Sequence, residues 1–328
     1  MKKYLITNVV YGDLYLRIFL ERHLRSLLDD TNLPAAVATH EIKYLIYTDV
    51  DTLPKLKDQP MIKRLAAVIG ENNLEIQVFE FPKATGDKFG ERYKVLATIF
   101  HASLKHALDN KFDYLTAWVS DLVVARDFFS RILKRMDDGH DAVFVLPLRS
   151  AFESTAHVFS QINRALVDID LFGLGFTHLH PLWVACHWGN PSFSRMPYSL
   201  LWKSPWGLLA RSYSVTPIIF VPKPEMQNTG GIIDVDVPQF CTNPYWCEDW
   251  LDAPVIGVEP LFCHYPPFHA QGCSVGIVKR WAYRKENAPI HPTQRPMLKK
   301  HLYYPSKKLA RIGWWQKFKS NMIARRLS

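Results

Sequence analysis

The carboxylate most able to do chemistry in this sequence is Asp121, which lies inside an apolar run. It follows Trp118-Val119 and precedes Leu122-Val123-Val124. Burying a carboxylate without a cation or hydrogen-bond donors is energetically expensive. A divalent metal that holds a diphosphate would compensate this charge, because Mg²⁺ binds through one or two carboxylates together with phosphate oxygens. A surface turn or a helix cap is the alternative interpretation of Asp121.

Two Asp-x-Asp strings add further carboxylates. The first, Asp49-Val50-Asp51, is followed by Thr-Leu-Pro, which predicts a turn. The second, Asp234-Val235-Asp236, follows two glycines and two isoleucines, a pattern that predicts a strand over residues 231–236. Alternate residues of a strand point to one face, so Asp234 and Asp236 are expected to bind one cation together. A chance match to so short a pattern is the alternative.

Glu248-Asp249 stands between Trp246 and Trp250. Sugar faces stack on aromatic rings, and partial desolvation between such rings raises the basicity of a carboxylate. The pair is therefore a candidate general base. A helix start is the alternative, because Asn243-Pro244 precedes the pair and acids are common in a first helical turn.

Histidines gather in the same half of the chain, at His178, His180, His187, His264 and His269. His178 and His180 are two residues apart, which is not the spacing of a paired metal site on a helix. Each histidine also has the simpler interpretation of a hydrogen-bonded residue without a ligand.

Alternating strands and helices must position these side chains. The expected strands are residues 4–10, 42–48, 75–81, 113–124 and 141–146, and the expected helices are residues 14–28, 60–69, 92–108, 127–136 and 150–167. This alternation predicts an α/β fold with a mainly parallel sheet and helices on both faces. Ligands bind beyond the carboxyl ends of such strands. We therefore expect the site among Asn8 to Asp13, Thr48 to Asp51 and Ser120-Asp121. Asp127 is expected to cap its helix.

Composition agrees with a packed globular protein. The chain has 328 residues, of which 48% are hydrophobic and 22% charged, as in one large α/β domain. Five cysteines without a CxxC pair argue against a disulfide framework or a zinc knuckle. The sequence has no GxGxxG, GxxxxGK[ST], HExxH or GxSxG motif, which removes the usual signatures of dinucleotide oxidoreductases, P-loop kinases, zinc proteases and serine hydrolases. No apolar run is long enough for a transmembrane helix, so we expect a cytoplasmic protein.

The net charge of +9 belongs to the C-terminal end of the chain. From Lys279 onward there are many Lys and Arg and one acid, Glu286. A helical face there combines aromatic, apolar and basic residues, namely Trp314, Trp315, Phe318 and Met322 with Lys317, Lys319, Arg325 and Arg326. This is the composition of an interfacial helix on anionic lipid, and it predicts peripheral contact with the inner membrane face through residues 299–328. Nucleic-acid binding or a solvated tail are the alternatives, and nucleic acid ranks last because no RNA-reading motif is present.

By the order of its elements, the segment 4–146 resembles the N-terminal half of GT-A fold nucleotide-sugar glycosyltransferases. In that family the strand equivalent to residues 113–124 ends in an Asp-x-Asp, which holds the metal and the nucleotide diphosphate. Here Asp121 matches the second acid, and Val119 stands in place of the first. The opening, Val9 to Asp13, is also similar to uncharacterised bacterial proteins thought to be glycosyltransferases.

The resemblance implies a GT-A-like (Rossmann-like) domain over residues 1–295, with a nucleotide-sugar half (1–170) and an acceptor half (171–295). A basic aromatic tail (296–328) follows. The implied donor-binding residues are Asn8, Val10, Tyr11, Asp49, Asp51, Ser120 and Asp121. The implied ligands of a divalent metal, Mn or Mg, are Asp121, Asp234, Asp236 and His264. If the enzyme inverts, Asp249 or Glu248 is the implied base; a retaining enzyme needs no base of that kind.

We therefore expect a glycosyltransferase that moves a sugar from a nucleoside diphosphate to a hydroxyl of a glycan or glycolipid. Two alternatives stay open. The first is a non-catalytic carbohydrate- or nucleotide-binding protein of the same fold, which the missing first Asp supports. The second is a nucleic-acid-associated protein that uses the basic tail.

Overall fold

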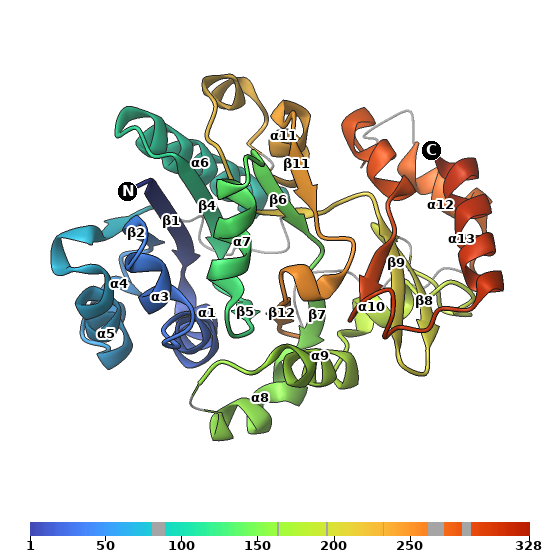
Figure 1. The fold of residues 1–328 in the computed structure, drawn as a ribbon, viewed down its shortest axis with the longest axis horizontal. Helices are drawn as coiled ribbons and strands as arrows, with labels where there is room; N and C mark the ends of the chain where they lie inside the picture. The colour runs from blue at the N-terminus through green and yellow to red at the C-terminus, as the bar shows by residue number, and fades with distance from the viewer. Residues whose placement is uncertain (81–88, 163, 195, 232, 262–271, 284–289) are drawn as a thin grey trace.

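A seven-stranded sheet forms the centre of the protein (Figure 1). The computed structural model describes residues 1–80, 89–162, 164–194, 196–231, 233–261, 272–283 and 290–328. The strands of this main sheet are β1 (Lys3–Val10), β2 (Glu41–Thr48), β3 (Leu74–Val78), β4 (Tyr114–Val119), β6 (Ala142–Val145), β10 (Thr216–Phe220) and β11 (Pro244–Trp246). Their order is β11-β6-β10-β4-β1-β2-β3. All neighbours are parallel except β10, which is antiparallel to β4 and β6. The expected mainly parallel sheet is confirmed.

Helices cover both faces of the main sheet, as expected. On β1, Leu5 and Val9 belong to the core shared with α6, while Tyr4, Ile6 and Val10 belong to the core shared with α3, α5 and α7. Near-continuous burial along β1 follows, because a strand covered on both faces has no solvent side. The α-helices between residues 1 and 240 are α1 (Gly12–Ile18), α2 (Leu24–Leu27), α3 (Leu33–Val37), α4 (Leu53–Lys57), α5 (Pro60–Ile69), α6 (Phe89–Asp109), α7 (Phe128–Asp137), α8 (Phe152–Gln161), α9 (Asp168–Thr177), α10 (Pro181–Ala185) and α11 (Ile233–Phe240). A π-helical turn, Phe19–His23, joins α1 to α2.

The expected strand over 113–124 is broken at Ser120-Asp121. β4 ends in the main sheet, and β5 (Leu122–Val124) begins a second sheet of order β5-β12-β7. β7 (Leu148–Ala151) follows β6 in the same way, and β12 is Val255–Glu259. The second sheet thus starts where two strands of the main sheet reach their carboxyl ends. The residues between the two sheets, Asp121 among them, lie at this junction.

Two local predictions were wrong. Residues 233–240 form α11, not part of a strand over 231–236. Two acids in its first turn favour a helix there, since they face the positive end of the helix dipole. Asp127 does stand at the N-cap of α7, but its side chain makes no capping hydrogen bond. Oδ1 of Asn32 takes this role and accepts from the backbone N–H of Phe128 (2.9 Å).

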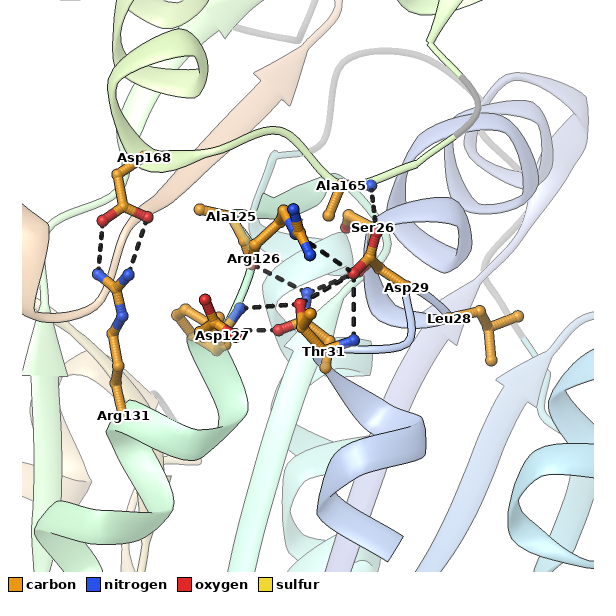
Figure 2. A network of polar contacts seen from close by, with 12 residues as sticks. Ser26, Leu28, Asp29, Thr31, Ala125, Arg126, Asp127, Arg131, Ala165 and Asp168 are labelled. Carbon is orange, nitrogen blue, oxygen red and sulfur yellow. Dashed lines mark hydrogen bonds and ion pairs between the residues drawn. The ribbon is translucent and has the colours of Figure 1, made fainter.

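A polar network fixes the chain that follows β5 (Figure 2). The carboxylate of Asp29 accepts hydrogen bonds from the hydroxyl and backbone N–H of Thr31 (2.8 and 3.1 Å) and from the backbone N–H of Ala165 (3.1 Å). Beside it, Arg131 of α7 pairs with Asp168 of α9 (2.7 Å). These contacts join the end of α2, the start of α7 and the segment before α9. They fix the position of the chain directly after β5, at one end of the second sheet.

A third sheet and its two helices lie at the C-terminal side of the molecule, at the right of Figure 1, and are called the third layer below. Its sheet has the order β13-β9-β8 and is covered by α12 and α13, with a separate hydrophobic core. The elements are β8 (Ser199–Ser204), β9 (Gly207–Ser212), α12 (Val275–Ala282), β13 (Leu302–Tyr304) and α13 (Trp314–Leu327). The segment 296–328, expected as a tail, is packed into this layer through β13 and α13. In the part of the chain described, no helix combines the length and apolarity needed to cross a membrane.

Candidate functional site

The carboxyl ends of β1 and β4 meet at the point where the strand order of the main sheet reverses. From β1 the chain runs through β2 to β3 on one side, and then returns to β4 on the other. Val9 pairs with Val119, so both strands end at the same height. Ligands of open α/β sheets bind at such a reversal, outside the carboxyl ends of the strands. Tyr11, Ser120 and Asp121 come directly after these ends.

Asp121 is the most unusual group at this edge. Only 6% of the residue is exposed. Its Oδ2 lies 3.9 Å from Nη1 of Arg149, and its buried Oδ1 has no hydrogen-bond partner in the described part of the chain. Burial raises the pKa of Asp121 to about 7, with Arg149 opposing this effect and Glu259 adding to it. A carboxyl group buried with so little compensation is costly to ionise, which marks Asp121 as the candidate functional group of this edge.

Arg149 reaches Asp121 across the second sheet. It lies on β7, pairs in register with Gly257 of β12, and donates a hydrogen bond from Nη1 to Oε1 of Glu259. A Cβ at Gly257 would stand 2.8 Å from Nη1 and 2.9 Å from Cδ of Arg149, so any side chain here would displace Arg149 from its present position. The opposite face of this sheet is closed by α9, where Gly175 packs against Leu148. Arg149 and Glu259 thus lie on the face of this sheet that is opposite α9.

Asp234 adds a third acid to the surroundings of Arg149. Its Oδ2 accepts a hydrogen bond from the hydroxyl of Ser214 (2.9 Å). Burial raises the pKa of Asp234, and Ser214 and Arg149 partly offset this. Arg149 therefore acts electrostatically on three carboxyl groups at once, those of Asp121, Asp234 and Glu259. Arg149 offsets the cost of ionising Asp121 and Asp234 only in part, because the pKa of each stays raised.

Asp234 and Asp236 do not form the expected joint site. They lie two residues apart on α11, and positions two apart on a helix point in nearly opposite directions. Asp236 is buried elsewhere and its Oδ1 accepts from the side-chain amide of Gln239 (3.2 Å). The prediction of one cation held by both carboxylates, which depended on a strand, is therefore wrong.

Of the three candidate residues at the end of β1, two are buried and one is partly exposed. Asn8 is fully buried: its Oδ1 accepts from the hydroxyl of Tyr44, and its Nδ2 donates to the carbonyl of Val119 (3.3 Å). This amide joins three strands and is not exposed to a ligand. Val10 is also buried, whereas Tyr11 is half-buried just beyond the strand. Of these three residues, Tyr11 is the one placed to touch a ligand.

Asp49 and Asp51 behave differently, although they belong to one turn. Asp49 accepts from the backbone N–H of Gly12 (3.1 Å) and from that of Thr52 (2.6 Å). It thereby ties the loop after β1 to the loop after β2. Asp51 is exposed. Asp49 thus shapes the edge of the sheet, and Asp51 is accessible from solvent. The expected turn at these residues is confirmed.

Glu248 and Asp249 contact the third layer. Oδ1 of Asp249 accepts from the backbone N–H of Lys307 (2.6 Å), and Glu248 is exposed, with Lys300 at 3.8 Å. The backbone of Asp249 also pairs with that of Tyr303 in an isolated parallel β-bridge. The next residue, Tyr304, is within electrostatic reach of Arg149: burial raises the pKa of Tyr304, and the guanidinium of Arg149 opposes this rise. The pair is therefore connected to the Asp121 group through β13, and no described contact joins the two directly.

The histidines do not build a metal site in the described chain. Nδ1 of His180 accepts from the backbone N–H of Leu182 (3.2 Å), so Nε2 carries the proton that faces the carbonyl of Pro260 (3.3 Å). His264 and His269 lie outside the described residues. No set of three His, Cys, Asp or Glu residues placed to hold a metal occurs among the residues described.

Sequence reasoning missed Arg149, Glu259 and Gly257. Glu259 could have been recognised from the sequence, because it follows the apolar run Val255-Ile256-Gly257-Val258 as Asp121 follows β4. Arg149 could not have been recognised, because nothing in its local sequence shows that its side chain crosses a glycine on a distant strand. Comparison of the chain with protein-family models and with curated proteins finds no match.

Proposed function

We propose that this protein is a GT-A-like nucleotide-sugar glycosyltransferase, which moves a sugar from a nucleoside diphosphate to a hydroxyl of a glycan or glycolipid. The observation that carries the proposal is Asp121, a buried carboxylate with an unpartnered oxygen in the described structure, beyond the carboxyl end of β4 and beside β1. In the family that the sequence resembles, an acid at this strand end organises the donor diphosphate. The strand-order reversal at β1 and β4 independently supports a ligand at this edge.

The residues present fit a divalent metal that is held jointly with the donor. Asp121 offers one unpartnered oxygen, and the excess of acids around Arg149 favours positive charge. A complete protein cage is not needed, because Mg²⁺ is usually bound by one or two carboxylates, water and substrate phosphates. Asp121 would hold the metal, which would neutralise charge on the leaving diphosphate.

The chain's own residues supply the remaining roles. Tyr11 would place its ring against the nucleoside at the end of β1. Arg149 keeps Glu259 paired and limits the repulsion felt by Asp121. In an inverting reaction, Asp249 or Glu248 would remove the proton of the acceptor hydroxyl, with the third layer beside it.

A non-catalytic binding protein of the same fold is the second candidate. Val119, which is 39% exposed, stands where the family has its first acid. An exposed apolar side chain at that position cannot bind a metal, and it favours ligand binding without catalysis. This candidate predicts donor affinity without hydrolysis or transfer.

The test is a thermal-shift and calorimetric panel of UDP-, GDP-, CMP- and dTDP-sugars, each with and without Mn²⁺. The panel uses wild type, Asp121→Asn and Asp141→Asn. Asp141 is a matched control: it is a partly buried carboxylate at the amino end of β6, where it accepts from the backbone N–H groups of Thr242 (2.7 Å) and Asn243 (3.1 Å).

We expect one donor to stabilise wild type, by about 2.7 kcal/mol at a hundredfold excess over its Kd. Asp121→Asn should abolish this shift, whereas Asp141→Asn should lower the starting stability and keep the shift. Sugar release from the bound donor would separate the transferase from the binding protein. If no nucleotide sugar binds wild type with or without metal, the proposal fails.

A further inference from the structure

One face of α13 exposes large apolar side chains. Trp314 and Trp315 are each 65% exposed, Phe318 is 40% and Met322 is 42% exposed. At 100° per residue these four positions span about 100° of the helix circumference. The buried positions, Ser320, Ile323, Ala324 and Leu327, lie on the opposite side and pack into the third layer. We call the four exposed residues the aromatic face.

The rings of the aromatic face pack on one another. Trp314 and Phe318 are stacked, with centroids 5.4 Å apart and an interplanar angle of 12°. Trp315 meets Phe318 edge to face at 6.0 Å. A further exposed ring, Trp206 (61%), belongs to the β8–β9 hairpin beneath, with the guanidinium of Arg311 at 5.4 Å. Apolar surface gathered in this way marks an interaction site.

Basic residues predominate around the aromatic face. Lys319, Arg325 and Arg326 are exposed on the same helix. The elements of the third layer, β8, β9, β13, α12 and α13, contain no Asp or Glu, and neither do residues 171–224 and 287–328 of the sequence. The acids that contact this layer, Glu248 and Asp249, do so beside β13, at Lys300 and Lys307. A helix face that combines basic and aromatic residues is complementary to an anionic surface.

α13 is rigidly mounted, so the aromatic face cannot turn inward. Arg211, which is 1% exposed, donates to Oδ1 of Asn321 (2.5 Å) and to the carbonyl of Leu298 (3.0 Å). The side-chain amide of Gln316 donates to the carbonyl of Lys203 (2.9 Å). Hydrogen bonds on both flanks of the buried side fix the rotation of the helix about its axis.

We propose that α13 is a membrane-docking helix, which lies flat on an anionic bilayer with the aromatic face in the headgroup region. Interfacial helices combine Trp, Phe and Met on one face with Lys and Arg beside them, as here. A second copy of this chain fits less well, because two such faces would bring their basic residues together. Single-stranded nucleic acid also fits less well, because the ring faces of Trp314 and Phe318 already cover each other.

The test is flotation of the full-length protein with phosphatidylcholine vesicles and with vesicles that also contain phosphatidylglycerol. Two double variants remove the two features separately: Trp314→Ser with Trp315→Ser, and Lys319→Gln with Arg326→Gln. The matched control for the Trp variant is Val167→Ser with Ile169→Ser, two exposed apolar residues at α9. The matched control for the charge variant is Lys57→Gln with Lys63→Gln, on α4 and α5 at the opposite side of the molecule from α13 (Figure 1).

We expect wild type and both controls to float with anionic vesicles and to bind neutral vesicles weakly. Each basic residue near an anionic surface contributes about fivefold in partitioning, so the double charge variant should lose roughly 25-fold. The double Trp variant should lose binding to both kinds of vesicle, with its circular dichroism unchanged. The proposal is overturned if wild type does not float with anionic vesicles, or if the controls lose as much binding as the variants. It is equally overturned if the aromatic face proves to hold a dimer or a nucleic acid in solution.

Discussion

Replacing Asp121 by Asn should make the ligand-free protein more stable at neutral pH, although it removes a residue of the proposed site. Burial raises the pKa of Asp121 from 3.8 to about 7 in the folded protein. The folded state therefore binds more protons than the unfolded state between these values, and stability falls as the pH rises through this window. At about pH 8 the ionised carboxylate costs up to about 4 kcal/mol, because one pKa unit is worth about 1.36 kcal/mol.

Asparagine keeps the shape of the protonated acid and removes the titration. The free energy of unfolding of Asp121→Asn should thus exceed that of wild type by an amount that grows by about 2.5 kcal/mol between about pH 5 and pH 8. Urea unfolding at several pH values measures it. In Asp141→Asn the difference should have the opposite sign: burial raises the pKa of Asp141, but hydrogen bonds from Thr242, Lys223 and Asn243 outweigh this and lower the pKa. A pH-independent difference for Asp121→Asn, or a less stable variant at about pH 8, would refute the reasoning.

Three further substitutions test the surroundings. Gly257→Ala should cost only about 1 kcal/mol, because the flexible side chain of Arg149 can move, yet it should weaken binding of the stabilising donor about tenfold or more in calorimetry. Arg211→Met should lower the free energy of unfolding by about 3 kcal/mol, since the buried carbonyl of Leu298 and the partly buried acceptors at Lys299 and Asn321 lose a charged donor; urea unfolding that matches wild type would contradict this. Asn32→Ala should cost about 2–4 kcal/mol in thermal unfolding, because it removes the cap on Phe128 and the donor to the carbonyls of Ser26 and Ala125; Asn32→Asp should be no more stable than Asn32→Ala, since its carboxylate would face the same two carbonyls.

The elements of the N-terminal half could be predicted because each carries its own period. The strands at 4–10 and 42–48 are apolar on both faces, and the helix at 60–69 has one apolar stripe, so local sequence was sufficient. Residues 231–236 were predicted as a strand because Ile-Asp-Val-Asp-Val alternates with period two, but residues 233–240 form a helix. Two acids in the first turn favour the helix locally, and Gly231, with a φ of +76°, lies against Ala97 of α6 before α11 begins.

Of the residues in the proposed site, Asp121, Asp234 and Tyr11 were among the sequence predictions, whereas Arg149, Glu259 and Gly257 were not. Asp121 could be found because an acid at the end of an apolar strand is visible in the sequence. Its neighbours come from β7 and β12, where the side chain of Arg149 crosses Gly257. A contact that depends on a missing Cβ on another strand has no local signature. The expected roles of Asp249 and Glu248 as base stay predictions.

The antiparallel strand β10 has a consequence for synthesis of the chain. It lies between β4 and β6, and the carbonyl of Ile218 accepts side-chain hydrogen bonds from Thr116 (2.6 Å) and Trp118 (3.1 Å) of β4. About 70 residues separate the end of β6 from the start of β10. A ribosome that adds roughly 5–20 residues per second leaves the facing edges of β4 and β6 open for roughly 4–14 s. Open edges are templates for pairing with other chains. The nascent protein thus passes through an aggregation-prone interval, and its yield in a cell depends on how well those two edges are shielded until β10 emerges.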